Sequence, residues 1–237
     1  MWCEKHGQYE AEKTFFNGLT FQSMCPKCEA EKMADEEQQQ KELEQKTKED
    51  NLIARGIEPE FFNATLENYI AENQSEENAL QAAKDLRDGK IKKLLLLGSN
   101  GVGKTHLASA LAKILHGKII TMFEFSSLLR GGYTKKMTEI ETIEKELLIY
   151  DFVVFDEFGL SKCSEMELNS FAYFVDKSHT RGKRFMLTSN LERAATNQNN
   201  AIENYLPNAV ISRFTQDSRI VEVKGRDRRR RATPSTL

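Results

Sequence analysis

The sequence predicts an α/β domain, a parallel sheet with helices on its faces, joined to a small N-terminal unit. From residue 94 onward, apolar segments of strand length alternate with segments of helical periodicity, an order typical of parallel sheets. The first of these segments, residues 94–97, is four leucines in a row, which suits a strand buried on both faces. A length of 237 residues accommodates one such domain and a small appendage, but not two full domains.

A glycine-rich segment follows the leucines directly and has the pattern G-x-x-x-x-G-K-T. Its glycines let the main chain fold tightly, so that successive N–H groups point inward and hold phosphate oxygens. Lys104 would reach the β- and γ-phosphates of ATP, and Thr105 would be a ligand of Mg²⁺. The next segment has helical periodicity and ends at Gly117, so a helix N-terminus would also face the phosphates. The predicted nucleotide-binding residues are Gly98, Ser99, Asn100, Gly101, Val102, Gly103, Lys104, Thr105 and His106.

A second apolar strand, residues 152–155, ends in the acidic pair Asp156-Glu157. Downstream of a phosphate-binding loop, this pair predicts that Asp156 supports the Mg²⁺ shell and that Glu157 polarises the attacking water. A third strand, at residues 185–190, ends in Asn190. Ligands of open α/β sheets lie at the carboxyl ends of strands, so Asn190 should lie beside the γ-phosphate, although it could instead form a turn or cap the next helix.

Further elements complete the α/β pattern. We expect a strand at 119–123, a helix to about Arg130 with a break at Gly131-Gly132, helices at 139–148, 166–179 and 201–214, and a last strand at 219–223. Phosphoryl transfer often uses an arginine on the developing negative charge, and Arg213 on the helix at 201–214 is the candidate. A surface salt bridge is the alternative role for Arg213.

Two short pairs, Cys3-x-x-His6 and Cys25-x-x-Cys28, predict a Cys₃His zinc site at the N-terminus. The aromatic residues between the pairs are enough for a small hairpin, which is too small to fold alone and which zinc would stabilise. Reduced structural thiols or a disulfide are the alternatives. Cys163 is far away in the sequence and is interpreted as a free thiol.

Residues 29–50 are rich in Glu, Gln and Lys and almost without apolar residues, which indicates a solvated helix or a flexible tether. After a break at residues 55–59, the side chains of Phe61, Phe62, Leu66 and Tyr69 could pack beside a nucleotide base or belong to the core. The predicted division is residues 1–28 for the zinc module, 29–54 for a charged helical linker, 55–231 for the ATPase domain and 232–237 for a disordered tail.

Composition and net charge bear on the partners and the cellular location of the protein. A net charge of −2 does not by itself indicate a nucleic-acid partner, so such binding would need a local patch. No apolar run has the length of a membrane span, and the first residues lack the features of a signal peptide. We therefore expect a cytoplasmic protein without a membrane partner.

These motifs together resemble the AAA+ ATPases, and among them the DnaC-type helicase loaders. The resemblance covers about residues 55–231 and is strongest in RGIEPEFFNATLENY, LLLLGSNGVGKTHLASALA, VVFDEFG, LTSN and VISRF. It implies that Asn190 is the sensor-1 residue and that Arg213 is an arginine finger acting on ATP held by a neighbouring subunit, so the protein would self-associate through its ATP site. Only about a dozen residues follow position 223, which leaves no room for the usual C-terminal helical lid domain.

The same resemblance implies partners. Residues 1–28 would bind a hexameric replicative helicase, which the protein would load onto single-stranded DNA, with Tyr133, Lys135 and Lys136 near the DNA. The segment Gly225 to Arg229 has the spacing of a family motif whose arginine faces the nucleotide, which nominates Arg229 within the arginine run that ends at Arg231. The run could equally contact nucleic-acid phosphates or solvate the tail. The alternative function is that of the related IstB-type ATPases, which regulate transposition by coating duplex DNA.

Overall fold

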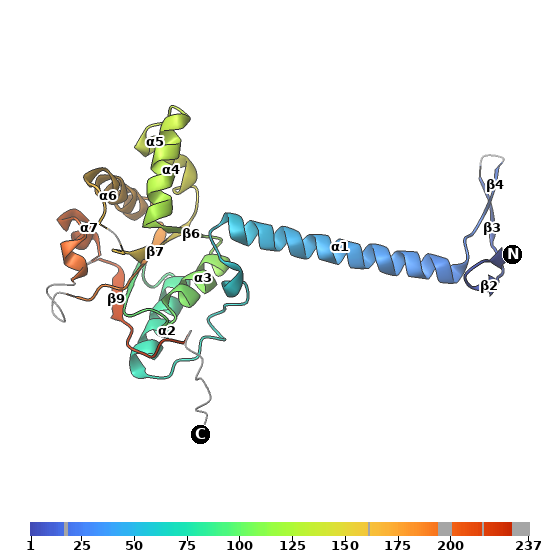
Figure 1. The fold of residues 1–237 in the computed structure, drawn as a ribbon, viewed down its shortest axis with the longest axis horizontal. Helices are drawn as coiled ribbons and strands as arrows, with labels where there is room; N and C mark the ends of the chain where they lie inside the picture. The colour runs from blue at the N-terminus through green and yellow to red at the C-terminus, as the bar shows by residue number, and fades with distance from the viewer. Residues whose placement is uncertain (17–18, 161, 194–200, 215, 229–237) are drawn as a thin grey trace, which may run out of the picture. The chain divides into compact units, whose positions relative to one another are not determined.

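A computed structural model describes residues 1–16, 19–160, 162–193, 201–214 and 216–228 (Figure 1). The predicted tail at 232–237 lies outside the described residues. The chain divides into two compact units, Met1–Asn51 and Leu52–Leu237. Within the described residues, no helix has both the length and the apolar composition needed to cross a membrane.

The first unit consists of two short antiparallel strand pairs and a long helix. β1 (Trp2–Cys3) pairs with β2 (Gly7–Gln8), and β3 (Lys13–Phe16) pairs with β4 (Leu19–Gln22), which is the predicted hairpin. Helix α1 (Pro26–Ala54) begins one residue after Cys25, and none of its residues is buried. Polar pairs four residues apart, such as Lys41–Glu37 and Gln45–Glu49, stabilise a helix that has no apolar face to bury.

The second unit is built on a five-stranded parallel sheet with the strand order β6-β7-β8-β5-β9. Its strands are β5 (Lys93–Leu97), β6 (Lys118–Thr121), β7 (Phe152–Phe158), β8 (Arg184–Ser189) and β9 (Ser218–Glu222). Its helices are η1 (Pro59–Phe61), α2 (Gln74–Arg87), α3 (Lys104–Ile114), α4 (Met122–Thr134), α5 (Glu139–Glu146), α6 (Glu165–Thr180), η3 (Ile202–Asn204) and α7 (Asn208–Arg213). The predicted parallel α/β fold is confirmed.

Alternate residues of the strands enter two different hydrophobic cores. Leu94 and Leu96 pack with the helices α2 and α3 on one face of the sheet. Leu95 and Leu97 pack with α4, α5, α6 and α7 on the other face. Because all four leucines are covered, β5 is buried along its whole length, as its sequence predicts.

Two expected helix boundaries are wrong. Helix α4 continues through Gly131 and Gly132 to Thr134. A Cβ at Gly132 would clash with the Thr142 side chain, so glycine allows α4 and α5 to approach each other there. The expected helix at 201–214 is instead the 3₁₀ turn η3 followed by the short helix α7, with Pro207 as the N-cap residue between them. The expected strand at 119–123 ends earlier, because Thr121 forms a capping box with Glu124 and starts α4.

The register of the sheet determines which polar residues meet. Leu97 of β5 lies opposite Ser189 of β8, so Gly98 and Asn190 leave the carboxyl edge side by side. Thr121 of β6 lies opposite Asp156 of β7. The order of the strands therefore gathers segments that are up to about a hundred residues apart in the sequence at one edge.

The opposite end of β5 holds a different element. Lys93, the first residue of β5, is fully buried, and its ammonium group donates hydrogen bonds to the carbonyl oxygens of Arg213 (2.7 Å) and Gln216 (2.9 Å). Burial lowers the pKa of Lys93. This lysine fastens the C-terminal end of α7 to the amino end of the strand that carries the phosphate-binding loop.

We predict that Phe155→Ala destabilises the second unit strongly. The Phe155 ring lies 4.8–5.4 Å from the rings of Phe125, Phe171 and Phe174, and the substitution would leave a cavity costing about 3–5 kcal/mol. Urea denaturation measures the loss. The matched control, Phe123→Ala, removes a ring that is 75% exposed and should change the unfolding free energy by less than about 0.5 kcal/mol. Equal losses in the two variants would contradict the proposed core.

Candidate functional site

The loop at residues 98–105 connects β5 to α3 and needs glycine for steric reasons. Gly103 has φ +92°, and a Cβ there would lie 2.6 Å from the Tyr69 ring. Gly98 has φ +145°, and a Cβ there would lie 2.1 Å from the carbonyl oxygen of Val223. Tyr69 also donates a hydrogen bond to the carbonyl oxygen of Val102 (3.1 Å), which fixes the loop from outside. Neighbouring segments therefore enclose the loop, and glycine is required at these two positions.

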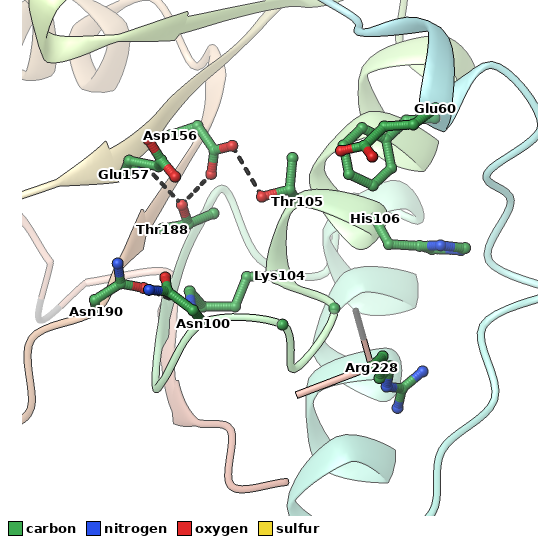
Figure 2. Close-up of a pocket in the computed structure, with 13 residues that line it drawn as sticks. Glu60, Asn100, Lys104, Thr105, His106, Asp156, Glu157, Thr188, Asn190 and Arg228 are labelled. Atoms are coloured by element: carbon green, nitrogen blue, oxygen red, sulfur yellow. Dashed lines mark hydrogen bonds between the residues drawn. The ribbon is translucent and has the colours of Figure 1, made fainter. Parts of the chain in front are cut away.

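Lys104, the first residue of α3, is buried and points back across the loop. Its ammonium group donates to the carbonyl oxygens of Gly98 (2.7 Å) and Ser99 (2.8 Å) and to Oδ1 of Asn190 (2.9 Å). The structure thus brings the predicted phosphate-binding lysine and the predicted γ-phosphate neighbour into contact (Figure 2). An ammonium group held by neutral oxygens at a helix N-terminus is well suited to bind the phosphates of a nucleotide.

Thr105 and Asp156 face each other, as expected for an Mg²⁺ site. The Thr105 hydroxyl donates to Oδ2 of Asp156 over 3.0 Å. Both are hard oxygen donors, and both line the same pocket as Lys104, which fits the ligand preference of Mg²⁺. Asp156 is buried, whereas Glu157, the next residue, is exposed to the pocket.

The pocket opens at the carboxyl edge of the sheet (Figure 2). It is lined by Glu60, Phe61, Asn100, Gly101, Gly103, Lys104, Thr105, His106, Asp156, Glu157, Thr188, Asn190 and Arg228. Among the predicted loop residues, Val102 is fully buried in the core, while Gly98 and Ser99 line a neighbouring hollow that also contains Asn190. Of the four aromatic and apolar residues offered for the base, Phe61 reaches the pocket, and Leu66 and Tyr69 are core residues.

The C-terminal segment contributes an arginine to the lining of the pocket. Arg229 lies outside the described residues, and Arg228 lines the pocket. The Arg228 guanidinium lies 4.7 Å from the centre of the Tyr69 ring and pairs with the buried Glu76 (2.6 Å), while its main-chain N–H donates to Gly101 (3.1 Å). The sequence contains five arginines in six positions, and the contacts with Tyr69 and Glu76 distinguish Arg228 among the described ones. The role of Arg229 stays a prediction.

His106 connects the loop to the segment before α2. Its Nε2 donates to the carbonyl oxygen of Thr65 (3.0 Å), which leaves Nδ1 as the acceptor of the neutral ring. Burial, with the nearby charge of Arg228 as a smaller cause, lowers the pKa of His106. The ring also contacts Tyr69 edge-on, with the centroids 5.5 Å apart.

Arg213 lies away from this pocket. It ends α7, and its guanidinium donates to Oδ1 of Asp176 on α6 over 2.7 Å, with both side chains about half exposed. Its carbonyl oxygen is bound by Lys93 at the amino end of β5, whereas the phosphate-binding loop follows the carboxyl end. The pocket and Arg213 are therefore separated by the length of the strand.

The four N-terminal residues predicted as metal ligands form one cluster. The ligand atoms of Cys3, His6, Cys25 and Cys28 all lie within 4.8 Å of one another. The Sγ atoms of Cys3 and Cys28 are 3.4 Å apart, too far for a disulfide, and all four cysteines of the chain are free. Nδ1 of His6 faces the sulfurs at 3.3–3.8 Å, and its Nε2 contacts Glu31 (3.2 Å). Three thiols and an oriented imidazole fit a tetrahedral ion.

The fold and this pocket define a class of protein. A parallel sheet in this strand order, a G-x-x-x-x-G-K-T loop before α3 and an acidic pair at the end of β7 are the architecture of a P-loop ATPase of the AAA+ type. The chain belongs to the family of IstB-like ATP binding proteins, whose family model matches residues 62–235.

Comparison with solved structures shows the same fold. The crystal structure of the DnaC helicase loader has 22% sequence identity and a TM-score of 0.60, and the match covers 70% of this chain and 100% of that chain. AMPPCP-bound DnaA from Aquifex aeolicus has 21% identity and a TM-score of 0.55, covering 73% of this chain and 53% of that chain. The crystal structure of DnaI has 20% identity and a TM-score of 0.53, and the match covers 72% of this chain and 93% of that chain. The sequence matches none of the curated proteins.

We predict that His106 makes stability depend on pH. Its folded-state pKa is lowered, so the unfolded chain binds a proton more readily, and stability is lost as pH falls below the ordinary histidine value of about 6.5. His106→Gln keeps an N–H donor for Thr65 but cannot titrate in this range. The unfolding free energy of the natural protein should therefore fall more steeply between about pH 7.5 and 5.5 than that of the variant. Parallel pH profiles from urea denaturation would contradict the assignment.

Proposed function

We propose that this protein is an ATP-dependent loader that places a hexameric replicative DNA helicase on single-stranded DNA during replication initiation. Two observations support the proposal. The described ATPase unit matches the DnaC helicase loader over the whole of that chain. A separate N-terminal unit carries a metal-type Cys/His cluster, which gives the protein a second element for binding a partner. The combination of these two units is the observation that carries the proposal.

ATP binds with its phosphates against the loop at residues 98–105. Lys104 exchanges its contacts with the loop carbonyls for the β- and γ-phosphates, and Thr105 and Asp156 hold the Mg²⁺. Held by Thr105 and Asp156, Mg²⁺ would supply positive charge against the negative charge that develops during the reaction. Glu157 orients the attacking water, and Asn190 lies beside the γ-phosphate through its contact with Lys104. Arg228 and His106 contact the nucleotide from the side of the pocket opposite Glu157 and Asn190 (Figure 2).

Arg213 completes the site of a neighbouring copy. Within its own chain it is held near the amino end of β5, away from the pocket, while its half-exposed side chain faces solvent beside Asp176. An arginine of this kind stabilises the transition-state charge and accelerates hydrolysis by about 10³–10⁵-fold. Self-association through the ATP site would therefore couple hydrolysis to assembly.

Zinc organises the N-terminal unit, and this unit binds the helicase. Thiolates and a neutral imidazole are the preferred ligands of structural zinc, and the distances between Cys3, His6 and Cys28 match a tetrahedral arrangement. Tyr133, Lys135 and Lys136, predicted near the single-stranded DNA, form the end of α4 and the turn after it. Tyr133 donates to Glu139 and Lys135 pairs with Glu146 (3.6 Å), so DNA would have to compete with these acidic partners.

We predict that Arg213→Ala abolishes the hydrolysis that depends on self-association and leaves nucleotide binding almost intact. Steady-state hydrolysis as a function of protein concentration, with binding of a fluorescent nucleotide in parallel, measures the two effects. Arg181→Ala is the matched control, because Arg181 forms a similar exposed pair with Glu144. Mixing Arg213→Ala with Lys104→Ala should restore part of the hydrolysis, since each variant supplies what the other lacks. A variant that hydrolyses ATP at the natural rate would exclude Arg213 from the reaction.

We predict that Cys28→Ser removes bound zinc and helicase capture together while ATP binding by the second unit persists. Metal analysis of protein purified without chelators measures zinc, and co-purification with a hexameric replicative helicase, with and without ATP, measures capture. Cys163→Ser is the control, since Cys163 lies outside the cluster. Helicase capture that survives the loss of Cys28 would overturn the role of the N-terminal unit. Preference for duplex DNA with no helicase capture would instead support the IstB-type function in transposition.

A further inference from the structure

Thr188, the penultimate residue of β8, bridges the two acidic residues of the ATP site with a single hydroxyl group. Its side chain is buried, and its hydroxyl contacts Oδ1 of Asp156 and the main-chain N–H of Glu157, the latter over 3.0 Å (Figure 2). A hydroxyl has one proton, and a carboxylate only accepts hydrogen bonds. Thr188 must therefore donate to Asp156 and accept from Glu157.

The bridge occurs where the regular pairing of the sheet is interrupted. Phe155 lies opposite Leu187, and the next pair is Phe158 with Ser189, so Asp156 and Glu157 together lie opposite Thr188. Two residues against one define a β-bulge, and a bulge removes an N–H group from the ladder of main-chain hydrogen bonds. The Thr188 hydroxyl accepts from the Glu157 N–H at this position.

Glu157 has an unusual main-chain conformation at the bulge. Its φ is +56°, in the left-handed region, which a non-glycine residue seldom occupies because it is strained. In a regular strand, the side chains of Asp156 and Glu157 would point to opposite faces of the sheet. In this conformation, both side chains line the same pocket. A hydrogen bond to the N–H of Glu157 helps to hold this conformation.

Asp156 is held at both oxygens. Thr188 contacts Oδ1 and Thr105 contacts Oδ2. If Thr105 served as an Mg²⁺ ligand instead, the contact with Thr188 would still fix the rotation of the Asp156 carboxylate. Ser189, the next residue on β8, similarly donates to the carbonyl oxygen of Phe158 (2.6 Å) and secures the far side of the bulge.

We propose that Thr188 is a positioning residue for ATP hydrolysis, which orients the Mg²⁺-binding carboxylate of Asp156 and aims Glu157 at the attacking water by stabilising the bulge in β7. The proposal rests on the proposed roles of Asp156 and Glu157 and adds the group that sets their geometry. Thr188 acts through these two residues.

The test compares Thr188→Val, which has the same shape without the hydroxyl, with Thr188→Ser, which keeps the hydroxyl. We expect Thr188→Val to lower kcat on the order of 10- to 100-fold and to raise the Mg²⁺ concentration needed for half-maximal binding of a fluorescent ATP analogue. Affinity for the same analogue without Mg²⁺ should not change. Thr188→Ser should retain most of the hydrolysis and the natural Mg²⁺ dependence.

Two controls separate positioning from stability and from the proposed function. Thr142→Val removes another buried hydroxyl, one that donates to Thr138 within the second unit and outside the pocket. Its melting temperature should fall while kcat and Mg²⁺ dependence stay natural. Glu157→Gln in the same assay tests whether Glu157 orients the attacking water. Normal hydrolysis by that variant would refute this role of Glu157, whatever the result for Thr188.

Three results would overturn the positioning role while Glu157→Gln remains inactive. The first is Thr188→Val with natural kcat and Mg²⁺ dependence. The second is equal impairment of Thr188→Val and Thr188→Ser, which would assign the effect to packing. The third is loss of Mg²⁺-free nucleotide affinity in Thr188→Val, which would mean that the whole pocket had collapsed.

Discussion

The position of one buried ammonium group constrains the carboxyl edge of the sheet. Lys104 begins α3, yet its charge reaches back to the carbonyl oxygens of Gly98 and Ser99 and to the amide of Asn190, which follows the neighbouring strand. A buried charge is stable only when polar groups surround it, so these contacts tie the loop, the helix and β8 together. In the proposed ATP complex, the negative charge of the triphosphate would lie at the same point as this ammonium group.

The strand order gives the remaining site residues their neighbours. β8 lies between β5 and β7, so its carboxyl end contributes to both sides of the pocket. Asn190 contacts Lys104 on one side, and Thr188 contacts Asp156 on the other. The C-terminal segment then returns over the loop, where Arg228 is fixed by Tyr69 and Glu76. Four segments far apart in the sequence meet because a parallel sheet places all strand ends of one kind on one edge.

β5 also relates the pocket to the surface that carries Arg213. Its carboxyl end leads into the phosphate-binding loop. At its amino end, Lys93 binds the carbonyl oxygen of Arg213, the last residue of α7, and that of Gln216, which follows the helix. Burial lowers the pKa of Lys93 because it disfavours the charged ammonium group. The two hydrogen bonds offset part of the free energy lost on removing this group from water. A strand buried on both faces is a rigid connection, so the two ends keep a fixed separation. The proposed role of Arg213 at the site of another copy requires such a separation within one chain.

The sequence by itself determined the elements whose signals are local. The glycine pattern, the four leucines and the apolar strand before Asp156-Glu157 located the loop, its helix and the acidic pair, and Cys3, His6, Cys25 and Cys28 were identified by spacing. Only the tertiary structure decided the features that depend on contacts between distant segments. Gly132 packs closely against Thr142, Arg228 lines the pocket where it contacts Tyr69 and Glu76, and Thr188 lies opposite a bulge in another strand. Periodicity and spacing carry no information about such partners, since these are brought together by packing rather than by sequence neighbours.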